Sequence, residues 1–117
     1  MNNYKIIIKN IDESLVYYCK GEFKNNGFYL DKFNFIFKGN DSILIENSIP
    51  VLNKIPLKKD HLFSFNYHSQ YGDMLLQSKL LNFEYSEVRM EIEYQLYQNG
   101  SLIGNYKIEL ERRDKLS

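Results

Sequence analysis

Residues 88–111 read VRMEIEYQLYQNGSLIGNYKIELE, and this stretch decides the fold class. Apolar side chains occupy every second position before the Asn99-Gly100 dipeptide and again after it. They are Val88, Met90, Ile92, Tyr94 and Leu96 in the first half, and Tyr106, Ile108 and Leu110 in the second. A period of two places alternate side chains on opposite faces of a strand. The stretch therefore predicts an antiparallel hairpin with one buried face.

The phase of the two strands restricts how this hairpin pairs. If Asn99 and Gly100 formed a plain two-residue loop, Tyr94 would face Asn105, and an apolar face would meet a polar one. Two solutions remain open, a three-residue loop Asn99-Gly100-Ser101 or a β-bulge near Gly104. Both predict the same pairs further along the strands, namely Tyr94–Tyr106, Ile92–Ile108 and Met90–Leu110.

The rest of the chain predicts further short strands, separated by turn-forming residues. The expected strands are residues 4–9, 15–23, 28–37, 42–47, 51–55, 62–67 and 74–85, the last of these being one long strand or two. Pro50 and Pro56 bracket residues 51–55, which predicts an edge or irregular strand because proline lacks the N–H that a ladder needs. No window of eleven residues sustains a helical period with caps. We therefore expect an all-β barrel or sandwich of about eight or nine strands.

Length and charge place the chain among ordinary globular domains. Its 117 residues are 44% hydrophobic and 26% charged, which fits a single domain with one core. We expect that domain to span residues 1–111 and the charged residues 112–117 to fray. Fifteen basic and fifteen acidic residues cancel, so the chain lacks the positive charge of a general nucleic-acid binder.

Apolar runs and cysteine usage indicate a compartment. The longest apolar runs are too short to span a membrane, and the first residues lack the apolar stretch of a signal peptide. The single Cys19 excludes an internal disulfide and suits a reducing environment. Cys19 also alternates with Leu15 and Tyr17, which predicts a packed thiol rather than a reactive one. We expect a cytoplasmic protein.

The residues that carry chemistry form no recognisable catalytic or metal-binding pattern. His61 and His68 are the only histidines, with Asp60 and Asp73 near them in sequence, but a metal needs three or four converging ligands. Ser69 follows His68 directly, and strand neighbours point to opposite faces, so the two do not make a nucleophile and its base. We expect surface histidines, no enzyme, no cofactor and no bound metal.

Single glycines at turns exclude a phosphate-binding loop, and the few clustered lysines indicate a solvated surface. Lys54, Lys58 and Lys59 form a small basic patch beside Pro56 that could meet an acidic partner. A solvated loop is the simpler interpretation, because lysine is ordinarily exposed.

The supply of aromatic residues is the feature with the clearest functional meaning. The chain has ten Tyr, eight Phe and no Trp. In a small barrel, inward rings either fill the core or line a cavity for one small ligand, and the core is the simpler interpretation. Inward tyrosines indicate a partly polar interior, since a buried hydroxyl usually finds a partner. The candidate ligand-binding residues are Phe33, Phe35, Phe37, Tyr67, Tyr94 and Tyr106.

Three segments resemble a bacterial family. The segment Tyr67-His68-Ser69-Gln70-Tyr71-Gly72-Asp73-Met74 is similar to its signature of a tyrosine, a small hydroxyl residue and a glycine. Residues 90–110 resemble its closing hairpin, and Gly21-Glu22-Phe23 its early glycine–aromatic element. The family is the YwiB-like group, domain of unknown function 1934. This chain has Ser69-Gln70 where members often carry Thr-Pro, and Glu46-Asn47 where an arginine often follows a strand. The resemblance implies a small antiparallel up-and-down β-barrel of the calycin-like (lipocalin) type.

Two functions follow as expectations. The first is a barrel that binds a small, partly apolar ligand in its interior or mouth. The alternative is an interaction protein that docks a protein partner, or a second copy as a homodimer, on an outer face or edge. The outward Tyr97, Tyr18 and Ile7 and the proline-marked edge motivate the alternative. Neither expectation involves nucleic acid or a membrane.

Overall fold

The computed structural model describes residues 1–48 and 52–113, which form ten β-strands and no helix. None of these residues belongs to a helix that could cross a membrane. The strands are β1 (Asn2–Asn10), β2 (Glu13–Lys24), β3 (Gly27–Leu30), β4 (Phe33–Phe37), β5 (Ser42–Asn47), β6 (Asn53–Lys58), β7 (Phe63–Ser69), β8 (Gly72–Tyr85), β9 (Arg89–Gln98) and β10 (Ser101–Arg113).

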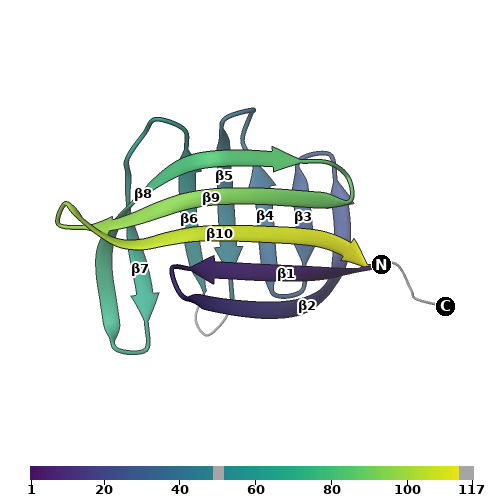
Figure 1. The fold of residues 1–117 in the computed structure, drawn as a ribbon, viewed down its shortest axis with the longest axis horizontal. Helices are drawn as coiled ribbons and strands as arrows, with labels where there is room; N and C mark the ends of the chain where they lie inside the picture. Colours follow the sequence, from purple (N-terminus) through teal and green to yellow (C-terminus); the bar gives the residue numbers. More distant parts are fainter. Residues whose placement is uncertain (49–51, 114–117) are drawn as a thin grey trace.

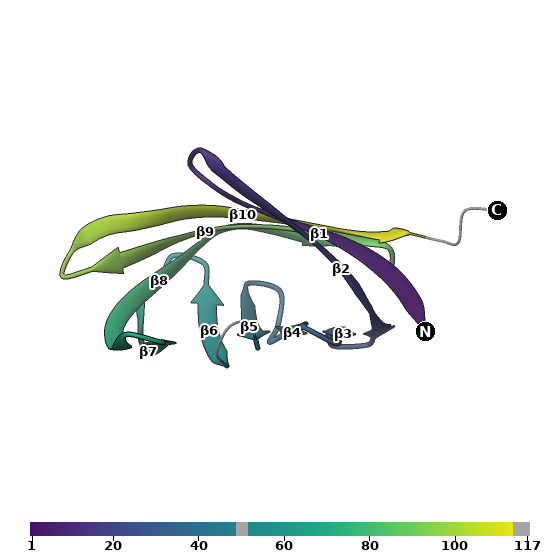
Figure 2. The same cartoon turned by 90° about the horizontal axis from the view of Figure 1, so that it is seen from below.

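All ten strands belong to one antiparallel sheet in the order β6-β5-β4-β3-β2-β1-β10-β9-β8-β7. Sequence neighbours are therefore sheet neighbours, except where β1 pairs with β10 and where the order breaks between β6 and β7. In Figure 1 the strands β1, β8, β9 and β10 run across the front, and β3 to β6 cross behind them. Figure 2 shows these as two layers, with β2 and β8 passing from one layer to the other. The sheet thus curls into a nearly closed up-and-down barrel.

The curl of β2 depends on Gly21. A Cβ atom at this position would overlap the carbonyl oxygen of Tyr29 and crowd the backbone of Leu30 on β3. Glycine therefore lets β2 and β3 approach closely at this position.

The closing hairpin has the predicted register. Tyr94 pairs with Tyr106, Ile92 with Ile108 and Met90 with Leu110. The loop is the two-residue Asn99-Gly100 turn, with positive φ angles of 51° and 80°, and the register shifts between Leu102 and Gly104. Of the two solutions left open by the sequence, the bulge is the one adopted.

The strand count exceeds the expectation because residues 28–37 form two strands. A turn at Asp31-Lys32 separates β3 from β4, and the backbone N–H of Asp31 donates to the carbonyl of Lys20 at 3.0 Å. The inward residues have even numbers before this turn, as at Phe28, and odd numbers after it, as at Phe35. A two-residue loop requires that change of phase, and one continuous strand could not have buried both sets.

Other boundaries move by a few residues. The tail 112–117 was expected to fray, but Arg112 and Arg113 pair with Tyr4 and Asn3 of β1 and belong to β10. Residues 114–117 lie outside the described residues, as do Pro50 and the first residue, Val51, of the predicted strand 51–55. Residues 72–85 form one long strand.

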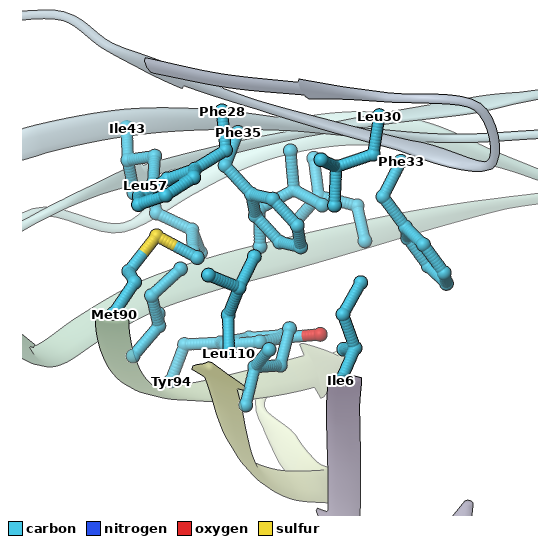
Figure 3. Close-up of a cluster of buried hydrophobic side chains, with 14 of the residues drawn as sticks. Ile6, Phe28, Leu30, Phe33, Phe35, Ile43, Leu57, Met90, Tyr94 and Leu110 are labelled. Carbon is cyan, nitrogen blue, oxygen red and sulfur yellow. The ribbon is translucent and has the colours of Figure 1, made fainter. Parts of the chain in front are cut away.

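The core lies between the two layers and is built from the inward residues of nearly every strand. Ile6, Phe28, Phe35, Leu57, Ile92 and Ile108 are among its fully buried members. Figure 3 shows side chains of the β3–β6 layer meeting those of β1, β9 and β10. Cys19 is buried in this core, as its alternation predicted. Burial raises the pKa of its thiol to about 11, with a smaller contribution from Asp31.

The break in the sheet between β6 and β7–β8, here called the seam, is joined by side chains and by one isolated β-bridge between Lys59 and Leu80. The buried Asn53 accepts a hydrogen bond from the His68 backbone N–H at 2.7 Å and donates to the His68 carbonyl at 3.0 Å. The buried Ser78 hydroxyl donates to the carbonyl of Pro56. The proline-marked strand is thus an edge, as predicted, but its free side faces β7 and β8 rather than solvent.

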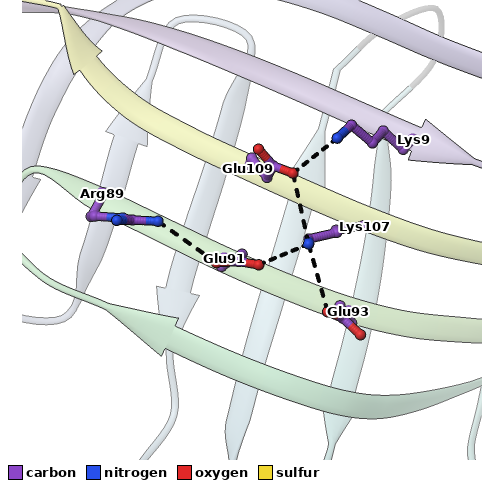
Figure 4. Close-up of polar contacts among 6 residues, drawn as sticks. All are labelled: Lys9, Arg89, Glu91, Glu93, Lys107 and Glu109. Carbon is purple, nitrogen blue, oxygen red and sulfur yellow. Dashed lines mark hydrogen bonds and ion pairs between the residues drawn. The ribbon is translucent and has the colours of Figure 1, made fainter.

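The outer face of β1, β9 and β10 carries a network of ion pairs (Figure 4). Lys107 Nζ lies 3.0 Å from Glu91 Oε1, 3.8 Å from Glu109 and 3.9 Å from Glu93, and Lys9 lies 3.1 Å from Glu109. Lys107, through its hydrogen bond and its charge, holds the pKa of Glu91 below the ordinary value. Such exposed pairs belong to a solvated face.

Candidate ligand cavity at one end of the barrel

The two ends of the barrel differ in what fills them. At the end where the β2–β3, β4–β5 and β8–β9 turns gather, here called the floor, aromatic rings pack together. Phe37 lies 4.1 Å from Tyr85 and 5.3 Å from Phe83 between ring centroids, and Phe23 lies 4.9 Å from Phe28. Rings at these separations close the floor with side chains.

The opposite end, here called the mouth, holds a cavity of about 360 Å³. The turns β1–β2, β7–β8 and β9–β10 lie at this end. The cavity is lined by Ile8, Leu15, Tyr17, Asn47, Asn53, Ile55, Tyr67, Met74, Leu76, Tyr94, Leu96, Ile103 and Tyr106. Its volume lies at the lower end of the range for small-molecule sites, which is roughly 300–1,000 Å³. The barrel is therefore packed at its floor and hollow at its mouth.

The closing hairpin supplies two of the tyrosines. Tyr94 and Tyr106 are direct cross-strand partners, and their rings stack at 5.1 Å with 13° between the planes. A Cβ atom at Gly104 would overlap the Tyr106 ring, so the bulge glycine makes room for that ring. The bulge that corrects the register thus also seats Tyr106 in the cavity wall.

The β7–β8 hairpin supplies Tyr67 and Met74, which face each other across the two strands. Its turn is held by Ser69, whose hydroxyl donates to the Gly72 carbonyl at 2.8 Å and accepts from the Tyr71 N–H at 3.1 Å. The segment that carries the tyrosine, hydroxyl and glycine signature is therefore a mouth hairpin that directs two side chains into the cavity.

The electrostatics of the cavity are those of a neutral site. None of the described lining residues carries a formal charge. Burial raises the pKa of Tyr94, with smaller contributions from Tyr106 and Tyr67, and burial likewise raises that of Tyr106. These hydroxyls stay protonated at neutral pH and can each donate and accept one hydrogen bond.

The six predicted ligand-binding residues divide into two groups. Tyr67, Tyr94 and Tyr106 line the cavity. Phe33, Phe35 and Phe37 are buried in the core instead, where Phe33 and Phe35 stack at 6.0 Å. All six point inward, but only the three tyrosines border the cavity.

Several lining residues were not among the predicted candidates. Tyr17 and Leu15 alternate with Cys19, so an inward phase was readable in the sequence, and Tyr17 rests edge-on against Phe33 at 5.2 Å. Asn47 and Asn53 border the loop between β5 and β6, and no periodic pattern marks them.

The histidines do not converge on a common site. They lie at opposite ends of β7, where His61 is exposed near the floor and His68 pairs with Asp73 across the mouth hairpin at 2.8 Å. Within residues 1–48 and 52–113, no group of three His, Cys, Asp or Glu side chains could hold a metal ion. In the basic patch, Lys54 lies 3.7 Å from Glu46 in an exposed ion pair.

Comparison with known proteins gives one family and one similar structure. The model of the domain of unknown function DUF1934 matches residues 3–110. The crystal structure of the ywiB protein from Bacillus subtilis is similar with a TM-score of 0.59 and 17% sequence identity, over 95% of this chain and 89% of that one. No curated protein matches. Because the family model covers almost the whole chain, the chain belongs to the DUF1934 family.

Proposed function

We propose that this barrel is of the calycin-like type and binds a small, partly apolar molecule in the mouth cavity. The observation that carries the proposal is the cavity itself, about 360 Å³ of space bordered by aliphatic side chains and four tyrosines. Sites for small molecules are typically concave and mostly apolar, with a few polar groups that fix orientation. This lining has that composition.

Binding rather than catalysis fits the residues around the cavity. The hydroxyl of Ser69 is held in its turn by Gly72 and Tyr71. The His68 side chain pairs with Asp73 and is not among the cavity-lining residues. The free, buried thiol of Cys19 suits a reducing compartment, and we place the protein in the cytoplasm on that ground.

A plugged variant and a matched control test the proposal. Leu15 and Val16 are adjacent on β2 and exposed to similar extents, 54% and 47%, but only Leu15 lines the cavity. Leu15→Trp should fill the mouth, whereas Val16→Trp places the same ring on the outer face. Metabolites screened by thermal shift should raise the melting temperature of the wild type and Val16→Trp, but not of Leu15→Trp.

Two outcomes would contradict the proposal. One is that no small molecule stabilises the wild type. The other is that Leu15→Trp keeps the full response while folded, as shown by circular dichroism, because the ligand would then lie outside the cavity.

A second candidate function, docking of a protein partner or a second copy, rests on the outer face of β1 and β2. Ile7 and Val16 are direct cross-strand partners there, and Tyr18 beside them is 68% exposed. Exposed apolar side chains of this kind are enriched at interfaces. Light scattering of the wild type and Val16→Lys tests it, and a wild type that stays monomeric at high concentration and captures no partner would count against it.

A further inference from the structure

We propose that the ligand is an uncharged molecule with an apolar body and one hydrogen-bonding group. This group lies at the inner end of the ligand and forms a hydrogen bond with the hydroxyl of Tyr94. This inference rests on the proposed function and specifies its ligand class. It assigns Tyr94 the role of specificity-determining residue.

The first argument is the charge of the cavity. A buried anion needs a cation or several donors close to it, and a buried cation needs a carboxylate. The described lining residues provide neither, because their polar groups are tyrosine hydroxyls and two asparagine side chains. A charged ligand would lose its hydration without an ionic partner, and a neutral ligand avoids that cost.

The second argument is the state of the Tyr94 hydroxyl. Tyr94 is only 4% exposed and borders the cavity. Among the described residues its hydroxyl makes no hydrogen bond, and it is not one of the fully enclosed side-chain atoms, so it is open to the cavity. The hydroxyls of Tyr17, Tyr67 and Tyr106 likewise make no hydrogen bond among the described residues, but these three cavity tyrosines are less buried than Tyr94.

A hydroxyl that is open to a cavity and bonds to no protein group is available to a ligand, because it can donate one hydrogen bond and accept another. Tyr94 lies between Ile92 towards the core and Leu96 towards the mouth on the inward face of β9. A group on the ligand that reaches Tyr94 must therefore pass Leu96 first. That geometry favours a molecule with its polar end inward and its apolar body against Leu96, Leu76 and Ile55.

A matched series of probes tests this assignment. Naphthalene, 2-naphthol and 2-naphthoate share one apolar body and differ in the end group, which is absent, neutral or anionic. The chain has no tryptophan, so naphthyl fluorescence reports binding directly. Each probe is titrated into the wild type, Tyr94→Phe and, as a control, Tyr18→Phe, which removes the same hydroxyl from an exposed ring on the outer face.

For the wild type and Tyr18→Phe we expect 2-naphthol to bind about fivefold more tightly than naphthalene, the effect of one net hydrogen bond of about 1 kcal/mol. We expect 2-naphthoate to bind at least roughly tenfold more weakly than 2-naphthol, since its charge is unpaired. In Tyr94→Phe the preference for 2-naphthol over naphthalene should disappear, while naphthalene binds as before.

The outcomes separate this inference from the proposed function. Two results overturn the role assigned to Tyr94 and the neutral ligand class. One is that 2-naphthoate binds as tightly as 2-naphthol, and the other is that the preference for 2-naphthol persists in Tyr94→Phe. Either result leaves the proposed binding of a small molecule in the cavity unaffected. Failure of all three probes to bind the wild type up to their solubility limits overturns this inference, and the thermal-shift screen then decides separately whether the cavity binds any small molecule.

Discussion

Asn53→Ala should loosen the barrel at its seam. Asn53 is 3% exposed, and its amide makes two hydrogen bonds to the backbone of His68, one in each direction. This arrangement copies the paired N–H and C=O contacts of an antiparallel ladder at a place where β6 and β7 share no ladder. The alanine variant removes both bonds and leaves the two backbone groups of His68 without these contacts.

The size of the effect follows from the two bonds. A net hydrogen bond contributes about 0.5–1.5 kcal/mol, so losing both should lower the free energy of unfolding by about 2 kcal/mol. The full cost of orphaned buried groups does not apply, because His68 is an exposed residue and water can reach its backbone. For a domain of this size, that loss corresponds to a fall in melting temperature of about 10 °C.

Urea unfolding measures the loss, and Asn66→Ala on the neighbouring position of β7 is the control, because Asn66 is exposed. The urea dependence of unfolding should stay unchanged if only the seam is weakened. Hydrogen exchange should also quicken at the His68 amide. If Asn53→Ala costs no more than Asn66→Ala, within about 0.5 kcal/mol, the seam is not stabilised by these bonds and the reasoning is wrong.

Three further predictions concern titratable side chains. Tyr4→Phe should raise stability by about 1 kcal/mol in urea unfolding, because the Tyr4 hydroxyl is buried without a partner among the described residues; a clear loss would refute this. Cys19, with a pKa of about 11, should react with a thiol reagent at pH 8 only after unfolding, and prompt labelling of the folded protein would contradict its burial. Glu91 has a lowered pKa in the folded state, so its pairing with Lys107 stabilises the fold above the ordinary value of 4.5 and ceases to do so as the pH falls through the lowered value. Lys107→Gln should therefore destabilise the protein at neutral pH but hardly in strong acid, and NMR titration should show the pKa of Glu91 returning towards 4.5; an unchanged Glu91 titration would refute the pairing.

How much of the fold could be predicted depended on the phase of each strand, that is, on which of its alternate positions carry apolar side chains. The register of β9 and β10 followed from the apolar alternation, because a hairpin with one buried face tolerates only one pairing. The same test would have found the turn at Asp31-Lys32, where inward residues change from even to odd numbers between Leu30 and Phe33. That turn was missed because its one turn-forming residue, Asp31, stands without a glycine, proline or asparagine beside it.

The seam could not be predicted from periodicity. Its bonds join single side chains, Asn53 and Ser78, to the backbones of strands that are not ladder partners. Neither residue differs in local sequence context from a polar residue on a solvated strand. Their burial results from the closure of the whole sheet, which depends on every strand at once.

The sequence left open whether a cavity lies in the barrel interior or at its mouth, although the aromatic residues encode part of the answer. Four of the ten tyrosines line the cavity and none of the eight phenylalanines does. The reason is physical, since a tyrosine hydroxyl needs a hydrogen-bond partner and a phenylalanine ring does not. Inward phenylalanines such as Phe28 and Phe35 can therefore occupy the solid part of the core, whereas inward tyrosines favour the end that meets water or a ligand. Tyr4 departs from this rule, and its predicted stabilisation on conversion to phenylalanine is the corresponding test. Once a register is known, the end of a small barrel at which inward tyrosines gather marks the place to look for its ligand.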